Sequence, residues 1–295
     1  RGWPPDALPE RRLRGLHRLL MHIHEQGVGC VSVPVQSEMS DTLFMRHGRY
    51  WQLEPWLPGT ADYWSKPSEA RLRSAARCLA KWHRAAKLFA PRQSEAEWFA
   101  CRIQCESPAV RERLQRIRGL QHGGIHHLKE SLPTNGRSEF HDIGRHILEL
   151  FPQAATAIES ELAAVKHFAF DLQPCLRDIW HDHVLFTGDE VTGFIDASAC
   201  RFENVATDLA RLFGSLIEDD SDAWQIALEE YQRQSPLTAE ERALVQRLDR
   251  SAVLLAGITW LRRSCTKNEA VSNDERVVLR MQIIATRLER LMRTL

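Results

Sequence analysis

Apolar residues recur at helical spacing over much of the chain. Four positions at intervals of three and four residues predict one buried helix face: Leu13, Leu16, Leu20 and Ile23. We expect this helix to run from Pro9 to a stop at Gln26-Gly27. Similar patterns predict further helices over 69–88, 138–167, 223–232, 239–258 and 274–295. Thr238 and Glu241 have the spacing of a capping box at the start of the helix over 239–258.

Shorter apolar runs predict strands in two places. Between the first two helices we expect strands at 31–35, 42–45 and 50–53, with a turn at His47-Gly48-Arg49. In the second half, a short strand and loop over 176–183 leads to two apolar strands, 184–186 and 191–195. The turn between these two, Thr187-Gly188-Asp189-Glu190, contains a glycine, so the strands are predicted to form a hairpin.

Two aspartates lie at the ends of this predicted hairpin. Asp178 precedes the hairpin and Asp196 closes it, so both can face one cleft. His183 follows Asp178 by five residues, which is the spacing of Asp and Asn in the catalytic loop of kinases. In that loop the Asp accepts the proton of the substrate hydroxyl and the Asn binds a metal ion. The structural alternative is that each acid caps a turn.

The segment from Cys175 to Arg211 resembles the aminoglycoside phosphotransferase and choline kinase-like enzymes. Their core reads roughly His-Gly-Asp-Leu-His-x-x-Asn, three apolar residues, a turn, an apolar residue, Ile-Asp and then Asp-Leu-Ala. The matching residues of this chain are Asp178, Val184-Leu185-Phe186, Phe194-Ile195-Asp196 and Asp208-Leu209-Ala210. Leu176-Arg177 stands where the family has His-Gly, and His183 stands where it has Asn. The resemblance covers nearly the whole chain from about residue 10 onward.

The resemblance implies an α+β fold of the protein-kinase-like, two-lobe type. It has a truncated small β lobe and a large, mostly helical lobe. We expect residues 1–58 to form a partial N-terminal, nucleotide-binding lobe. Residues 59–295 are expected to form the C-terminal helical lobe, with the catalytic hairpin at 175–211. His83 is expected to be a packing and hydrogen-bonding residue, and Asp208 to cap a helix and brace the loop.

The resemblance also implies an activity, the transfer of the γ-phosphoryl group of ATP or GTP to a hydroxyl of a small molecule. Asp178 would orient and deprotonate that hydroxyl. Asp196 would hold Mg²⁺ between the β- and γ-phosphates, and His183 would take the second metal position or form a hydrogen bond near it. Imidazole is a softer ligand than an amide oxygen, so a His183 ligand would favour Mn²⁺ over Mg²⁺.

The segment Glu54-Pro55-Trp56-Leu57-Pro58-Gly59 resembles the connector between the two lobes of these enzymes. In the family, backbone groups of the connector bind the adenine edge. Pro55 has no N–H, so a purine here would use the Glu54 carbonyl and the Trp56 amide. The alternative is a linker stiffened by proline. Arg1 could occupy the basic position that holds the α- and β-phosphates, in which case the glycine-rich loop would lie upstream of the sequence as given.

Two other functions stay open at this point. The lack of a glycine-rich loop and the histidine at position 183 also fit a kinase-like binding module (a pseudokinase) without transfer activity. The third interpretation is a hydrolase metal site at His181-Asp182-His183, for which only the two histidines could share a metal.

Composition limits the partners and the cellular compartment that we expect for this protein. Lys plus Arg and Asp plus Glu are equal, 39 each, so no overall charge favours nucleic acid or an anionic membrane as a partner. No apolar run approaches the roughly 18 to 20 residues of a spanning helix. The seven cysteines are scattered without a CxxC pair, which favours a reduced, cytoplasmic setting. The expected partner is a small-molecule hydroxyl acceptor, and the oligomeric state stays open.

Overall fold

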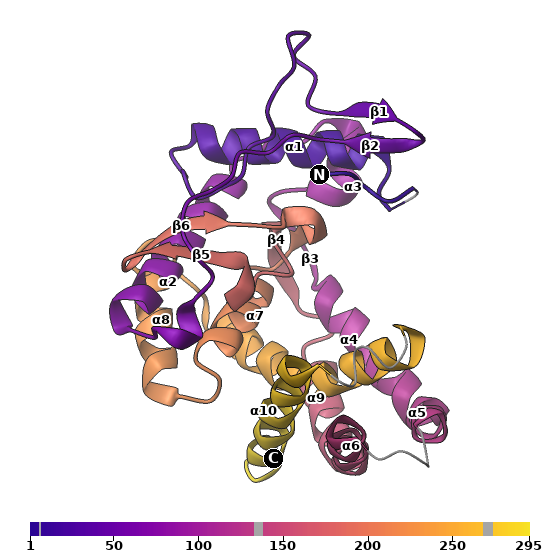
Figure 1. Cartoon of the computed structure of the whole chain (residues 1–295). Coiled ribbons are helices and arrows are strands. Elements are labelled where there is room, and N and C mark those ends of the chain that lie inside the picture. Colours follow the sequence, from indigo (N-terminus) through magenta and orange to yellow (C-terminus); the bar gives the residue numbers. More distant parts are fainter. Residues whose placement is uncertain (6, 133–137, 268–273) are drawn as a thin grey trace. The chain divides into compact units, whose positions relative to one another are not determined.

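The computed structural model describes residues 1–5, 7–132, 138–267 and 274–295 (Figure 1). The chain forms two compact units, one of residues 1–105 and 169–242 and the other of residues 106–168 and 243–295. The first unit contains the small sheets and several helices, and the second is helical. The mixed α+β class is therefore confirmed.

The first unit begins with the predicted helix and a small hairpin. Helix α1 (Glu10–Glu25) buries the predicted leucine stripe. Strands β1 (Phe44–Arg46) and β2 (Arg49–Trp51) are antiparallel around Gly48, whose φ of 69° suits glycine. The N-terminal residues lie along β2, where Trp3 N–H donates to the Tyr50 carbonyl at 2.8 Å. The strand expected over 31–35 is wrong, because this segment makes one isolated bridge, between Val31 and Phe194.

Helix α2 (Glu69–Ala86) is the central helix of this unit. The Ser68 hydroxyl caps it by accepting a hydrogen bond from the Arg71 N–H at 3.1 Å. It packs against α1, β6 (Glu190–Phe194) and α8 (Ser221–Gln232). The unit also contains the short helix α3 (Ala96–Phe99) and helix α7 (Ala206–Leu216). Helix α8 starts slightly before the predicted residue 223 because Asp220 caps it.

The predicted hairpin is present. Strands β5 (Val184–Thr187) and β6 (Glu190–Phe194) pair antiparallel, with a register shift between Leu185 and Phe186. A second sheet has the order β3 (Ile103–Glu106), β4 (Ala169–Cys175) and β7 (Arg201–Glu203). The strand expected to start at Leu176 is wrong, because β4 ends at Cys175. The next N–H groups bind the Asp208 side chain and not a neighbouring strand.

The second unit is built around α6 (Glu139–Ala163), which packs against α4 (Pro108–Gly119), α5 (Ile125–Ser131) and α10 (Glu275–Met292). Helix α9 (Ala239–Lys267) is longer than predicted and starts in the first unit. Its predicted capping box is confirmed: Glu241 N–H donates to Thr238 Oγ1 at 3.1 Å, and Thr238 N–H donates to Glu241 Oε2 at 3.0 Å. None of the helices in the described ranges is apolar over a stretch long enough to cross a membrane.

Candidate active site

A buried network holds the loop that follows β4. The Asp208 carboxylate accepts hydrogen bonds from the N–H groups of Leu176 at 2.7 Å and Arg177 at 2.6 Å. His83 Nε2 donates to the same carboxylate at 3.0 Å, and the Tyr231 hydroxyl donates to His83 Nδ1 at 2.8 Å. Burial raises the pKa of Tyr231, which keeps the phenol a neutral donor. Helices α2, α7 and α8 therefore fix this loop together.

These contacts agree with the hydrogen-bonding role expected of His83 and with the loop-bracing role expected of Asp208. The helix-capping role is not Asp208's, because the Asn204 side chain accepts from the Ala206 N–H at 2.9 Å at the start of α7. Ligating atoms of His83, Cys175 and Asp208 lie within 4.8 Å of one another. Burial raises the pKa of the Cys175 thiol well above its usual value, and its Sγ donates to the Glu203 carbonyl at 3.3 Å. We therefore interpret these three residues as a structural cluster and not as a metal site.

Asp178 lies directly after this braced loop. Arg177, the residue before it, has a left-handed backbone with φ of 63°, a conformation that costs energy outside glycine and often marks functional sites. The Asp178 side chain is half exposed, and its Oδ1 accepts a hydrogen bond from Arg211 Nη2 at 3.0 Å. Arg211 also lies over the Trp180 ring, 5.6 Å from its centre. The carboxylate is thus oriented and still accessible.

His183 connects the segments that hold the two acids. Its Nδ1 donates to the Asp178 carbonyl at 2.7 Å, and its Nε2 accepts from the Trp180 indole N–H at 3.0 Å. The His183 carbonyl accepts from the Ile195 N–H at 3.0 Å, next to Asp196. Both ring nitrogens are therefore engaged, and binding of a metal at Nε2 would require loss of the Trp180 hydrogen bond.

Asp196 lies two residues after the end of β6 and has a left-handed backbone, with φ of 56°. Its Oδ1 accepts from Arg1 Nη1 at 2.8 Å and from the Ser198 N–H at 3.4 Å. Burial alone would raise the pKa of this carboxyl, but the bonds from Ser198 and Arg1 and the charge of Arg1 outweigh it and lower the pKa. Asp196 is therefore held ionised next to a cation.

Three of the sequence-predicted site residues line one small cavity of about 20 Å³: Arg1, Glu54 and Asp196. The Glu54 carboxylate accepts a hydrogen bond from Gln52. Trp56 is not part of the lining, and its side chain is 97% exposed. The structure thus brings Arg1, Glu54 and Asp196 together and leaves Trp56 on the surface.

The segment that resembles the connector is anchored on the β5–β6 hairpin. Thr60 and Phe186 exchange two backbone hydrogen bonds, of 3.0 and 2.9 Å. Thr192 Oγ1 donates to the Pro58 carbonyl at 2.6 Å. Gly59 has φ of 104°, and a Cβ there would lie 2.4 Å from Thr192 Oγ1 and 2.7 Å from the Phe186 carbonyl oxygen. This position therefore requires glycine.

Comparison with known families decides the class. The phosphotransferase enzyme family matches residues 3–244, which is most of the chain. The chain belongs to this family. The predicted enzyme class, a phosphotransferase, is thereby confirmed, and the comparisons give no support to the binding module without transfer activity.

Solved structures of this phosphotransferase fold are similar to the chain at low sequence identity. Spectinomycin phosphotransferase APH(9)-Ia, solved with ADP and spectinomycin, has a TM-score of 0.68 at 9% identity, over 93% of this chain and 81% of that one. The amicoumacin kinase hAmiN has a TM-score of 0.61 at 12% identity, over 96% and 78%. An aminoglycoside phosphotransferase from Alicyclobacillus acidocaldarius has a TM-score of 0.56 at 15% identity, over 98% and 86%. No curated protein matches the sequence.

The geometry does not support the alternative of a hydrolase metal site at His181-Asp182-His183. His181 is buried and stacks on Trp64, with ring centres 4.0 Å apart. His183 Nε2 is bound to Trp180. Within the described ranges, the two histidines are not part of any cluster with metal-ligand spacing.

Several features of the candidate site could not be predicted from the sequence. Arg211 is the residue directly after Asp208-Leu209-Ala210. This position next to a family motif could have suggested a role near Asp178. Tyr231 and Trp180 carry no comparable signal. The sulfur atoms of Cys30 and Cys78 face each other, although neither residue lies in a paired motif. Their Cα atoms are 7.5 Å apart, which is beyond the usual span of a disulfide.

Proposed function

We propose that the chain transfers the γ-phosphoryl group of ATP or GTP to a hydroxyl of a small molecule, with Asp178 as the general base. The observation that carries this proposal is the link through His183. Its ring binds the Asp178 carbonyl, and its own carbonyl binds the residue next to Asp196. One residue thereby sets the position of one acid against the other, and phosphoryl transfer depends mostly on such positioning.

Asp178 suits the role of base because its side chain is accessible and oriented. The hydrogen bond from Arg211 fixes one carboxylate oxygen and leaves the half-exposed side chain within reach of a small acceptor. The acceptor's hydroxyl proton would pass to this carboxylate as the oxygen attacks phosphorus.

Asp196 suits a divalent metal. Its carboxylate is a hard oxygen ligand, and its lowered pKa keeps it ionised. A bound Mg²⁺, or Mn²⁺ as the alternative, would neutralise charge on the phosphates. The hAmiN structure contains AMP-PNP and Ca²⁺, which supports a nucleotide with a divalent cation. Because both His183 nitrogens are engaged, we propose His183 as a positioning residue and not as the second metal ligand.

Residues 1–58 supply the proposed nucleotide lobe, and residues 59–295 the catalytic helical lobe. Arg1 lines the cavity at Asp196 and is the proposed phosphate-binding cation. The Glu54 carbonyl and the Trp56 amide are the proposed contacts of the purine base, and the exposed Trp56 ring is accessible for stacking. The proposed setting is cytoplasmic, with a small-molecule acceptor and neither nucleic acid nor membrane as partner.

The test is a transfer assay with ATP or GTP, Mg²⁺ and a panel of aminoglycosides, macrolides and amino alcohols. For an acceptor that supports turnover, Asp178→Asn should lower kcat at least about 100-fold, the usual contribution of a general base. Asp182→Asn is the matched control, because Asp182 lies in the same loop and both acids have side chains 50% exposed. Equal activity of the two variants would refute the role of Asp178.

A further inference from the structure

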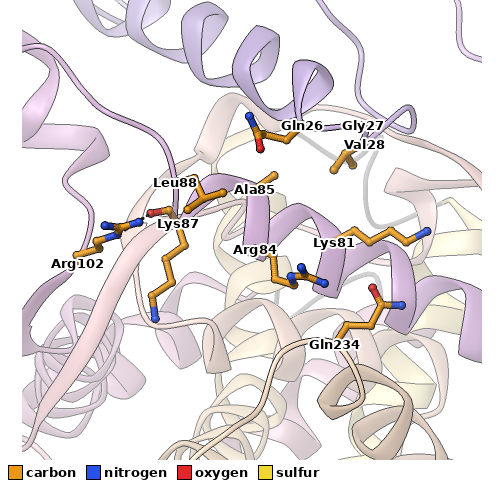
Figure 2. Close-up of a pocket in the computed structure, with 10 residues that line it drawn as sticks. All are labelled: Gln26, Gly27, Val28, Lys81, Arg84, Ala85, Lys87, Leu88, Arg102 and Gln234. Atoms are coloured by element: carbon orange, nitrogen blue, oxygen red, sulfur yellow. Dashed lines mark hydrogen bonds between the residues drawn. The ribbon is translucent and has the colours of Figure 1, made fainter.

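A pocket of about 500 Å³ lies beside the C-terminal half of α2, within the first unit (Figure 2). Its lining includes four cationic side chains, two neutral amides and no carboxylate. The cations are Lys81, Arg84, Lys87 and Arg102, and the amides are Gln26 and Gln234. The chain as a whole has equal numbers of basic and acidic residues, so this excess of positive charge is local.

The positive charge of the pocket is only partly neutralised. Lys87 Nζ lies 3.4 Å from Asp171 Oδ2, in an exposed pair that stabilises little. For Lys81 and Arg84, no ion pair with any residue in the described parts of the chain is present. Figure 2 shows these two side chains leaving α2 on the side of Gln234. An anion in this pocket would therefore meet cations without carboxylate partners.

Arg102 adds a second, independent observation. Its backbone is left-handed, with φ of 55°, although it is not glycine. Its Nε donates to the Lys87 carbonyl at 3.3 Å, which places the guanidinium beside the end of α2 (Figure 2). A strained residue that carries an arginine to a cluster of cations points to a function at that place.

Helix stabilisation explains only part of this cluster. Helix α2 ends at Ala86, and cations in its last turn interact favourably with the helix dipole. That accounts for Arg84 and Lys87. It does not account for Lys81, which lies more than one turn before the end, or for Arg102, which comes from another segment.

We propose that this pocket binds a small phosphate-bearing anion with at least two negative charges, such as a diphosphate. Its volume is within the range of small-molecule sites. Arginine and lysine are the usual partners of phosphate oxygens, and the two glutamine amides supply neutral donors. Arg1, Asp178 and Asp196 do not line the pocket, so the bound anion is neither the donor nor the acceptor of the proposed transfer.

The test is isothermal titration of inorganic pyrophosphate into the full chain, in buffer freed of divalent metal. The double variant Lys81→Gln/Arg84→Gln should bind pyrophosphate at least about tenfold more weakly than the wild type, because two charge-assisted hydrogen bonds are lost. Arg49→Gln/Lys129→Gln is the matched control. It removes two exposed charges outside the pocket, so its affinity should stay within about twofold of the wild type.

The fold of each variant is checked by circular dichroism and by its thermal midpoint. Arg1 is retained in both variants, so binding at the nucleotide site cannot produce a difference between them. Equal affinity of the two double variants, or no binding by the wild type, would overturn the proposal.

Discussion

Three donors converge on the buried carboxylate of Asp208, and this residue holds the start of the loop that leads to Asp178. Their order and spacing, matched to the family core, single out Asp178, Asp196 and Asp208 as candidates. The sequence was not sufficient to predict their partners. Arg1 and Asp196 are 195 residues apart, and His83 and Tyr231 are 148 apart, so only the folded chain defines these contacts.

Asp208→Asn should lower the free energy of unfolding by about 3 kcal/mol, because an amide N–H₂ would replace one acceptor and face buried donors. Urea unfolding followed by tryptophan fluorescence measures this change. Asp171→Asn is the control, because the Asp171 carboxylate has exposed partners: it pairs with Lys87 and accepts a hydrogen bond from Gln104 Nε2 at 3.1 Å. This variant should cost less than about 1 kcal/mol. Similar losses in both variants would contradict the bracing role.

At the scale of elements, periodicity predicted the long helices and the β5–β6 hairpin, because their buried faces follow the helix and strand repeats. Strand β4 was missed. Pro174 lies inside it, and proline usually argues against a strand interior. The strand expected at 31–35 failed because this apolar segment makes one isolated bridge, between Val31 and Phe194, and no ladder.

The connector offers a test at this scale. Gly59→Ala should destabilise the chain by at least about 2 kcal/mol and weaken nucleotide binding, because the added Cβ meets the Phe186 carbonyl at a positive φ. Gly188→Ala is the matched control. Its φ is 60°, but nothing lies within 4 Å of the added Cβ, so only about 1 kcal/mol of backbone strain is expected. Thermal unfolding with and without nucleotide measures both effects.

At the scale of the whole molecule, we expect the loss of folding stability in acid to follow from buried titratable groups. The net charge at pH 7 is zero and does not account for it. Burial lowers the pKa of His17, and the hydrogen bond to Gln52 only partly opposes this. The Thr42 hydroxyl is 2.8 Å from Nδ1 and Gln52 Oε1 is 3.0 Å from Nε2, which suits a neutral imidazole. The unfolded chain takes up a proton at His17 near pH 6.5.

Because the folded pKa of His17 is lowered, its contribution to stability is present above about pH 6.5 and is lost as the pH falls toward the folded value. The thermal midpoint should therefore decrease as the pH is lowered from 7.5 to 5.5. The decrease should be smaller in His17→Gln. His126→Gln, which alters an exposed histidine, should keep the slope of the wild type. An unchanged slope in His17→Gln would contradict this assignment.

The central claim is that Asp196 holds the metal of a nucleotide site, with Asp178 as the base and His183 as a positioning residue. The most direct measurement is the thermal shift produced by a non-hydrolysable ATP analogue with and without Mg²⁺. The wild type, Asp178→Asn and His183→Gln should each show extra stabilisation with Mg²⁺, and Asp196→Asn should show none. A metal-dependent shift in Asp196→Asn equal to that of the wild type would contradict the account, and its loss in His183→Gln would make His183 a ligand.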